Sequence, residues 1–386
     1  MRQDIESILP KIIQIRHKLH QHPELSFAET TSMEIIRDAL EEFGLSPQCG
    51  IGKTGIVCEI DSGRPGDVVG FRADFDALAI EEATDLPYAS TNSGVMHACG
   101  HDGHAAILLC VAGVLANNTH LFNGKVICVF QPAEETGEGA QAMLLDDTLT
   151  RYPIDQIFAL HNFPKYPAGQ VTVKDGCVLA GMERFTITFT GVAGHASIPE
   201  ACSNPITAAA RFQMDIAEDI ANVKDEDALA EINLTHIESI QSDSINVTPS
   251  QVTIKGVTRA SSLPSQQRIR QRLEEKISSF SQDLGIRMSL NITHSCPPTI
   301  NDTDATNRLR HAAKTALGHT GFEELNRTLA TFDDFAYWSE QVPGCYFFIG
   351  NGSDSPMVHT AQYNFNDEII APAARVFLNL VIDKSL

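Results

Sequence analysis

The amino-acid sequence predicts an α/β protein with a mostly parallel sheet, interrupted by a smaller inserted α+β domain. Two observations carry this prediction. Short apolar runs that suit buried strands alternate with longer segments of helical periodicity, which is typical of a parallel sheet covered by helices. Between residues 183 and 296 the pattern changes to strands of alternating polarity, such as residues 184–189, which indicates a sheet with one exposed face.

Length and composition limit the class of protein. The chain has 386 residues and a formal net charge of −21, and a chain of this length is expected to form two domains. The negative charge argues against nucleic acid or an anionic membrane as partner, because both require a basic face. No apolar run reaches the ~18 residues of a membrane span, and the N-terminus lacks a signal-peptide pattern. The cysteines are odd in number and scattered, which fits a reducing compartment and predicts a cytoplasmic protein.

The N-terminal third is expected to form helices at residues 4–20 and 30–43 and strands at 55–60 and 67–73. Three histidines, His17, His20 and His22, surround the end of the first helix, and we interpret them as structural because polar groups are common at helix ends. The run Gly52-Lys53-Thr54 resembles the end of a phosphate-binding loop. The leading glycine of that motif would fall at Pro47, so the motif is excluded.

The densest group of candidate ligands is His97-Ala-Cys99-Gly-His101-Asp-Gly-His104, directly before an apolar helix predicted for residues 105–116. Cys99 and His101 are two residues apart, so on an extended segment both side chains would point to the same side. A thiolate and an imidazole directed at one point are ligands of a divalent ion such as zinc. A histidine-rich turn that caps a buried helix is the structural alternative.

Further polar groups stand at or shortly after the ends of predicted strands. Strands at 67–73, 125–130, 155–160 and 345–349 lead to a second set of groups: Asp74, Asp76, Glu134, Glu135, His161 and His359. Ligands bind at the carboxyl ends of the strands in α/β sheets, so we expect these side chains to converge. Of the two adjacent glutamates, one suits a metal ligand and the other a free general base. Without the buried strand before them, a solvated turn would be the better interpretation.

The inserted segment is expected to follow a β-α-β-β-α-β order, which predicts a ferredoxin-like sandwich. Its strands are predicted at residues 184–189, 229–237, 251–259 and 287–294, and its helices at 205–223 and 265–284. We therefore predict a catalytic, metal-binding α/β domain formed by residues 1–182 and 297–386. Residues 183–296 are expected to form an inserted domain, for which we predict a lid and dimerisation role, and Pro297-Pro298 is the expected returning hinge.

The candidate ligands are Cys99, His101, Glu135, His161 and His359, one more than a single structural zinc site holds. The set suits two neighbouring divalent ions that share a water. Thiolate favours zinc, whereas carboxylate and imidazole also accept manganese, nickel or cobalt. Two alternatives remain: a hydrolase with Cys99 as nucleophile, and a non-catalytic metal- or metabolite-binding protein. The first leaves three candidate ligands without a role, and the second does not need a free base.

Several motifs together resemble the N-acyl-amino-acid amidohydrolase branch of the aminoacylase and zinc-carboxypeptidase family, which includes hippurate hydrolases and indoleacetyl-amino-acid hydrolases. The resemblance spans nearly the whole chain. The motifs that carry it are Leu19-His-Gln-His-Pro-Glu-Leu-Ser26, Arg72-Ala-Asp-Phe-Asp-Ala-Leu78, Met96-His-Ala-Cys-Gly-His-Asp-Gly-His104, Phe130-Gln-Pro-Ala-Glu-Glu135, Leu160-His161, Gly194-His-Ala-Ser197 and Asn246-Val-Thr-Pro249.

This resemblance implies hydrolysis of the amide bond of an N-acyl amino acid or small peptide-like substrate, with two divalent metal ions per subunit. The implied metal ligands are Cys99, His101, Glu135, His161 and His359. Glu134 is implied as the general base that takes a proton from the metal-bridging water, and Asp76 as the carboxylate that orients a group of the metal site.

Substrate contacts and assembly are implied as well. His195 and Asn246 match groups of the lid domain that touch the scissile carbonyl or the substrate carboxylate, and Arg259 is a further candidate for that carboxylate. A homodimer through the lid domain is expected, because a ferredoxin-like sheet leaves edge strands unpaired. The chain departs from the family at Phe332-Asp333-Asp334-Phe335, where Ser-Glu-Asp-Phe is common, and at Val358-His359-Thr360, where Leu-His followed by Ser or Asn is common.

Overall fold

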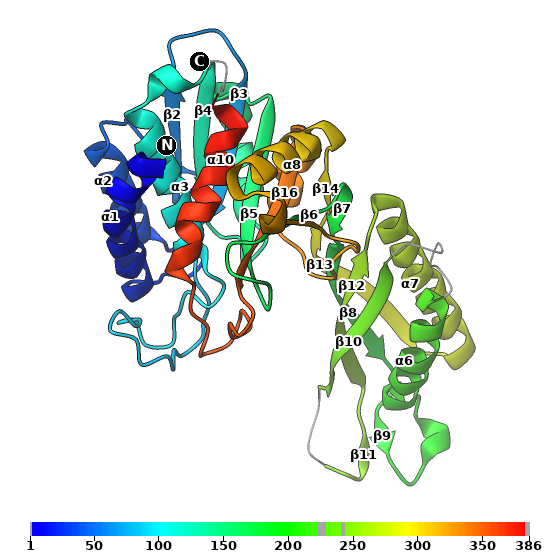
Figure 1. Cartoon of the computed structure of the whole chain (residues 1–386). Coiled ribbons are helices and arrows are strands. Elements are labelled where there is room, and N and C mark those ends of the chain that lie inside the picture. Colours follow the sequence, from blue (N-terminus) through cyan, green and yellow to red (C-terminus); the bar gives the residue numbers. More distant parts are fainter. Residues whose placement is uncertain (1, 222–228, 241–243, 383–386) are drawn as a thin grey trace. The chain divides into compact units, whose positions relative to one another are not determined.

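The computed structural model describes residues 2–221, 229–240 and 244–382 (Figure 1). The chain forms two compact units. Unit 1 comprises Met1–Val178, Ile300–Arg327 and Asp333–Leu386, and unit 2 comprises Leu179–Thr299 and Thr328–Phe332. The predicted division into residues 1–182 with 297–386 and residues 183–296 stays a prediction.

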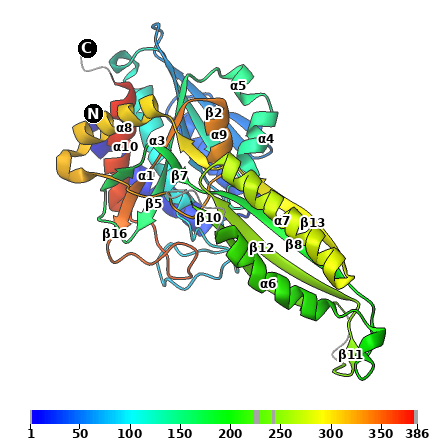
Figure 2. The ribbon, with the colours of Figure 1, turned by 90° about the vertical axis from the view of Figure 1, so that its right-hand side faces the viewer.

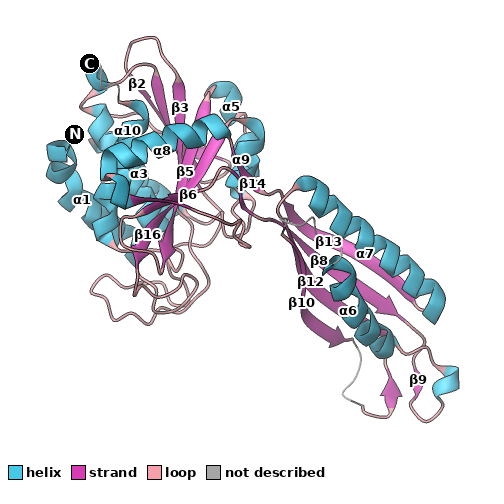
Figure 3. Cartoon of the chain, turned by 45° about the vertical axis from the view of Figure 1, so that its right-hand side comes forward, coloured by secondary structure: helices cyan, strands magenta, loops and turns pink. Residues whose placement is uncertain are grey.

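Unit 1 contains an eight-stranded sheet in the order β1-β2-β4-β3-β5-β16-β6-β15 (Figure 3). Its strands are β1 (Gln48–Ile51), β2 (Gly55–Asp61), β3 (Val68–Asp74), β4 (Lys125–Gln131), β5 (Gln156–Pro164), β6 (Val171–Val173), β15 (Phe322–Glu324) and β16 (Gly344–Gly352). The central neighbours β4, β3, β5 and β16 run parallel, so their carboxyl ends lie at one edge of the sheet. The prediction of a mostly parallel sheet is confirmed.

Helices cover this sheet. They are α1 (Arg2–Gln21), α2 (Thr30–Glu42), α3 (His101–Ala116), α4 (Gly139–Leu145), α5 (Thr148–Arg151), α8 (Thr303–Leu317), α9 (Phe335–Gln341) and α10 (Ile370–Val381), with 3-10 turns η1 (Thr119–Leu121), η3 (His319–Gly321) and η4 (Asp367–Ile369). Helix α3 is buried along almost its whole length, because it is apolar on all sides and packs against β3, α1 and α10. Figure 2 shows α4, α5 and α9 on the side of the unit away from α1 and α10.

In unit 1, two wrong element boundaries fall at candidate ligands. Helix α3 begins at His101 and not at residue 105, so the end of the histidine motif forms its first turn. Gly100 precedes it with a φ of 90°, so Cys99 and His101 do not lie on one extended segment. Strand β5 continues to Pro164, so His161 lies inside the strand and not at its end. Continued pairing with β16 explains the longer strand.

Unit 2 contains a four-stranded antiparallel sheet in the order β10-β12-β8-β13. Its elements are β8 (Gly181–Thr190), α6 (Pro205–Ala221), β10 (Ala230–Ser239), β12 (Gln251–Ala260), α7 (Leu263–Leu284) and β13 (Arg287–Cys296). The predicted ferredoxin-like order is confirmed. Residues 222 and 223, the predicted end of the first helix of this unit, lie outside the described residues.

The core of unit 2 lies between one face of its sheet and the two helices, where Phe185, Ile187 and Phe189 pack against Phe212 and Leu273. The sequence prediction missed the two-residue strands β9 (Gly194–His195) and β11 (Val247–Thr248), which pair with each other. It also missed β7 (Gly176–Leu179), which pairs with β14 (Thr299–Asn301), and the turn η2 (Pro199–Ala201). None of the described helices combines the length and apolar character of a membrane span.

Candidate active site

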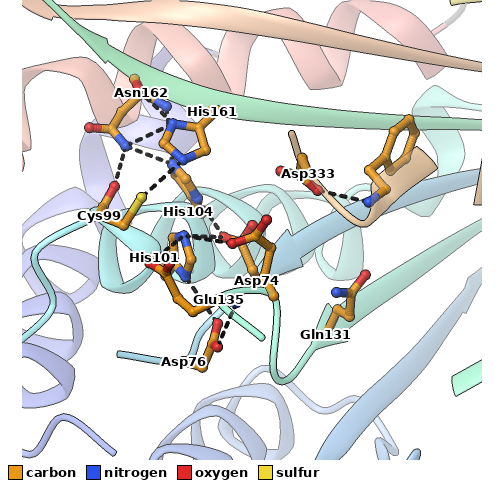
Figure 4. A network of polar contacts seen from close by, with 12 residues as sticks. Asp74, Asp76, Cys99, His101, His104, Gln131, Glu135, His161, Asn162 and Asp333 are labelled. Carbon is orange, nitrogen blue, oxygen red and sulfur yellow. Dashed lines mark hydrogen bonds and ion pairs between the residues drawn. The ribbon is translucent and has the colours of Figure 1, made fainter. Parts of the chain in front are cut away.

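Thiol, imidazole and carboxylate groups gather at the carboxyl edge of the parallel strands in unit 1 (Figure 4). The Cys99 sulfur lies 3.3 Å from Nε2 of His161. Ligand atoms of Cys99, His101 and His161 all lie within 4.8 Å of one another, and the same holds for Cys99, Glu135 and His359. The five predicted ligands therefore come together from the β3–α3 connection, from the first residue of α3, from β5 and from the segments that follow β4 and β16.

A glycine turn places Cys99 and His101 on the same cluster. Gly100 adopts a left-handed conformation, which L-residues with a side chain disfavour. A Cβ atom at this position would also lie 2.7 Å from both the Asn162 amide nitrogen and the Tyr363 hydroxyl. The backbone therefore turns sharply here, and the side chains of these two candidate ligands converge from a loop and from the first residue of a helix.

The paired glutamates follow β4 in a turn fixed from both sides. Ala133, with a φ of 52°, donates its backbone N–H to the buried Glu29 carboxylate at 2.9 Å. The backbone N–H of Glu135 donates to Oδ2 of Asp76 at 3.1 Å. Oδ1 of Asp76 lies 3.1 Å from Nδ1 of His101, so this one carboxylate orients both a glutamate and a histidine of the cluster.

His359 reaches the cluster from the loop after β16. Its backbone has a φ of 61°, and its N–H donates to the carbonyl of Ala98 at 2.8 Å. Nε2 of His359 lies 3.6 Å from Oε2 of Glu135, and 53% of the His359 side chain is exposed. The loop is thus tied to the cysteine motif, while the imidazole forms the open side of the cluster.

The donor set fits divalent metal ions. Nε2 of His101 and Oε1 of Glu135 are buried without a hydrogen-bond partner among the described residues, an arrangement that costs free energy unless something binds there. Burial raises the pKa of Glu135 to about 7, and burial together with the negative Glu135 raises the pKa of the Cys99 thiol. Divalent cations relieve both effects, because they stabilise carboxylate and thiolate.

Glu134 lies beside the ligand cluster but also faces other acids. Its carboxylate lies 4.0 Å from Nε2 of His101 and within 4.8 Å of the carboxylates of Asp333 and Asp334. Burial, followed by the negative charges of Asp333 and Glu135, raises the pKa of Glu134 well above its usual value. A carboxyl group in these surroundings holds a proton more readily than an exposed glutamate.

A buried network behind the cluster was not recognised from the sequence. Arg72 contacts Asp74 at 2.5 Å, Asp334 at 2.9 Å and Asp333 at 3.1 Å, and all four side chains are buried. Asp74 in turn lies 2.5 Å from Nδ1 of His104, whose Nε2 accepts the backbone N–H of Asn162 at 3.0 Å. The sequence contains signals for this network, because Arg72 and His104 belong to two of the motifs that carry the family resemblance and Asn162 follows a predicted ligand.

The three predicted substrate residues lie in unit 2. His195 is exposed on β9, and its Nδ1 accepts the backbone N–H of Ser197 at 3.2 Å. Asn246 stands next to it, because its carbonyl accepts the N–H of Ala196 at 2.9 Å and Val247 pairs with His195. Arg259 lies on β12, and its Nη1 is buried without a hydrogen-bond partner among the described residues.

The parallel sheet with its cluster of metal-type ligands, together with the inserted ferredoxin-like unit, defines a metallohydrolase of the metallopeptidase-like class. Residues 70–383 match the sequence model of Peptidase family M20/M25/M40, and the chain belongs to this family. The resemblance seen in the sequence motifs is thereby confirmed.

Individual members of the family are similar to this chain over nearly its whole length. The chain is 32% identical over 383 residues to a hippurate hydrolase of Campylobacter jejuni, covering 97% of this chain and 99% of the relative. It is 32% identical over 381 residues to an N-acetylcysteine deacetylase of Bacillus subtilis, covering 96% of each. Among solved structures, a Bacillus subtilis dinuclear metal-binding peptidase of the M20 family superposes with a TM-score of 0.82 at 29% identity, covering 97% of this chain and 98% of that one.

Proposed function

We propose that this protein is a metal-dependent amidohydrolase that cleaves the amide bond of N-acyl amino acids. The observation that carries the proposal is the convergence of one thiol, three imidazoles and one carboxylate on a cluster that leaves buried ligand atoms without partners. The residues proposed to hold two divalent ions are Cys99, His101, Glu135, His161 and His359. Zinc or manganese suits this mixed set, and nickel or cobalt is compatible with it.

When bound, such ions polarise a carbonyl and lower the pKa of a water molecule. The proton transfers are assigned to a side chain of the protein. Glu134 is proposed as the general base, which takes a proton from the attacking water and returns it to the leaving amine. Its buried place beside His101 and next to Glu135 supports this role. Asp76 is proposed to hold the ring of His101 and the backbone of Glu135 in the orientation that ligation requires.

The names of three relatives support the proposed substrate class, N-acyl amino acids. A hippurate hydrolase, an N-acetylcysteine deacetylase and an indoleacetyl-amino-acid hydrolase of Arabidopsis thaliana all carry names of enzymes for acylated amino acids. We assign His195 and Asn246 to the scissile carbonyl and Arg259 to the substrate carboxylate. The exposed imidazole of His195 next to Asn246, and the unpartnered guanidinium nitrogen of Arg259, support these assignments.

We further propose a homodimer formed through unit 2, within which residues 183–296 act as the lid. Strands β10 and β13 are the edges of its sheet, and an unpaired edge strand offers its backbone N–H and C=O groups to another chain. Exposed apolar side chains on or near β10, such as Ile237 and Ile240, support an interface there. A cytoplasmic location is proposed as well, because Cys58, Cys110, Cys128 and Cys345 are buried among apolar residues, as expected of cysteines in a reducing compartment.

The test is metal removal followed by a substrate screen. Purified protein is stripped with a chelator, reloaded with zinc or manganese, and assayed for release of free amine from N-acetyl, N-benzoyl and indoleacetyl amino acids. We expect no turnover in stripped protein and recovery on reloading, with about two ions per chain by elemental analysis. Full activity in metal-free protein, or binding of metal without hydrolysis of any acyl amino acid, would overturn the proposal.

A further inference from the structure

Two guanidinium groups of unit 2 share one aromatic ring. The guanidinium carbon of Arg259 lies 5.3 Å from the centroid of the Phe332 ring, and that of Arg184 lies 5.9 Å from the same centroid. Phe332 belongs to the short segment Thr328–Phe332 that packs with unit 2. It also stands at the position where the family commonly has serine, as noted in the sequence motifs.

The strand register places both arginines on one face of the sheet. Arg259 on β12 pairs with Met182 on β8, and Arg184 follows two residues later on β8, so both side chains project to the same side. The core residues Phe185, Ile187 and Phe189 point to the opposite side, toward α6 and α7. The two cations therefore lie on the face that the helices leave uncovered.

Neither cation has an acidic partner within hydrogen-bond reach among the described residues. Glu183, adjacent to Arg184, is buried and bonds to Arg270 instead. Glu231 is the facing acid by register, since it pairs with Arg259 on the neighbouring strand, but no ion pair joins them. Burial and the nearby Arg184 guanidinium lower the pKa of Arg259. Two like charges held close together in a chain of net charge −21 indicate a site for an anion.

We propose that Arg184, together with Arg259 and Phe332, selects substrates that carry a second carboxylate, namely N-acyl derivatives of aspartate and glutamate. This inference rests on the proposed function, in which Arg259 takes the α-carboxylate. The guanidinium of Arg184 then takes the side-chain carboxylate, while the ring of Phe332 contacts both guanidinium groups. A guanidinium binds a carboxylate through two parallel N–H bonds, so each arginine can engage one carboxylate.

Packing alone does not account for the arrangement. A cation over an aromatic ring at a partly exposed site contributes only about 0.5–1 kcal/mol, and one guanidinium would cover the ring. A second guanidinium adds repulsion, which an anion with two charges removes. His294, which pairs with Arg184 on the neighbouring strand, has its ring centroid 6.4 Å from that of Phe332.

The experiment compares matched substrates in the metal-loaded enzyme. N-acetylglutamate is paired with N-acetylglutamine, and N-acetylaspartate with N-acetylasparagine, because each pair differs chiefly in one charge. We expect wild-type kcat/KM to favour the acidic member by about tenfold or more, the usual contribution of a charge-assisted hydrogen bond. Arg184→Gln is expected to bring the ratio near one through a higher KM. Arg184→Lys is expected to keep part of it, because the charge remains.

Two controls separate the causes. Arg211→Gln removes an exposed positive charge from α6, in the helix layer on the other side of the sheet, and is expected to leave the ratio unchanged. Phe332→Leu keeps an apolar side chain but removes the ring, and is expected to weaken the acidic preference less than Arg184→Gln does. A wild-type ratio near one, or an unchanged ratio in Arg184→Gln, overturns the inference.

The failure of this inference can be told from failure of the proposed function. If uncharged acyl amino acids are cleaved but the acidic ones are not preferred, only the inference is wrong. If none is cleaved, calorimetric titration of N-acetylglutamate and N-acetylglutamine into the metal-loaded protein still tests the site. Tighter binding of the acidic compound that depends on Arg184 would support it, and equal binding would overturn it.

Discussion

Asp76 holds His101 and Glu135 at once: its Oδ1 lies 3.1 Å from Nδ1 of His101, and its Oδ2 accepts the backbone N–H of Glu135 at 3.1 Å. Ser26 donates a further hydrogen bond to Oδ2 at 2.8 Å. One carboxylate therefore fixes the orientation of a ring and of a glutamate turn that come from different parts of the chain.

Asp76→Asn is expected to lower metal affinity by about 10- to 100-fold, the usual cost of removing a group that orients a metal ligand. The amide has only one acceptor oxygen, so it cannot serve the histidine and the backbone N–H together. Competition with a coloured chelator measures the affinity. Asp38→Asn, which changes an exposed carboxylate on α2, is the control. Unchanged affinity in Asp76→Asn would show that the ligands are held by other contacts.

Glu134→Gln and Glu135→Gln are expected to differ although the residues are adjacent. Glu134→Gln should keep both metal ions and lose at least about 100-fold in kcat, because an amide cannot accept the proton. Glu135→Gln should lose metal as well as activity, because it removes the carboxylate proposed as a ligand. Elemental analysis alongside steady-state kinetics checks the pair. If both variants bind metal as the wild type does, the two roles are assigned wrongly.

Cys99→Ala separates the metal-centre interpretation from a thiol nucleophile. A nucleophile variant would be inactive and still carry its full metal content, whereas we expect metal occupancy and activity to fall together. The raised pKa of the buried Cys99 thiol also argues against a free thiolate before metal binds, with burial as the main cause. Cys110→Ala, a buried thiol on α3, is the matched control and is expected to retain its metal.

Arg72→Met is expected to destabilise the protein by about 3–5 kcal/mol, because it leaves the buried carboxylates of Asp74, Asp333 and Asp334 without their cation. Chemical denaturation of the metal-free protein measures the change in free energy of unfolding. Arg37→Met removes one member of an exposed ion pair with Asp38 and is expected to change stability by less than about 1 kcal/mol. Equal effects of the two substitutions would contradict the role given to the Arg72 network.

A mixing experiment tests whether His195 acts on the partner's site within the proposed dimer. His195→Ala and Glu134→Ala proteins are each expected to be inactive. If His195 works across the dimer, random exchange leaves one intact site in each hybrid, which gives roughly a quarter of wild-type activity at equal mixing. Differently tagged chains show whether exchange occurs. A mixture that exchanges and stays inactive would place the action of His195 within its own chain.

Local sequence patterns determined the architecture of this protein. Period-two alternation in residues 184–189 and the continuous apolar runs of the parallel strands indicate which sheet faces are buried, because burial depends directly on side-chain chemistry. The candidate ligands lie near or after the carboxyl ends of these strands, so the carboxyl edge of the sheet was predictable as the site. The boundaries at His101 and Pro164 were not, because a left-handed glycine and pairing with β16 decided them.

Only the tertiary structure decided the contacts between distant residues. Arg72 contacts Asp333 and Asp334, from which it is separated by more than half of the sequence. Phe332 follows the inserted domain in the sequence and contacts Arg184 and Arg259. Nothing in the local sequence around these residues specifies their partners. Their positions follow from how the sheets and helices pack. The groups that the folded chain brings beside a buried charge decide whether that charge is stabilised or left without a partner.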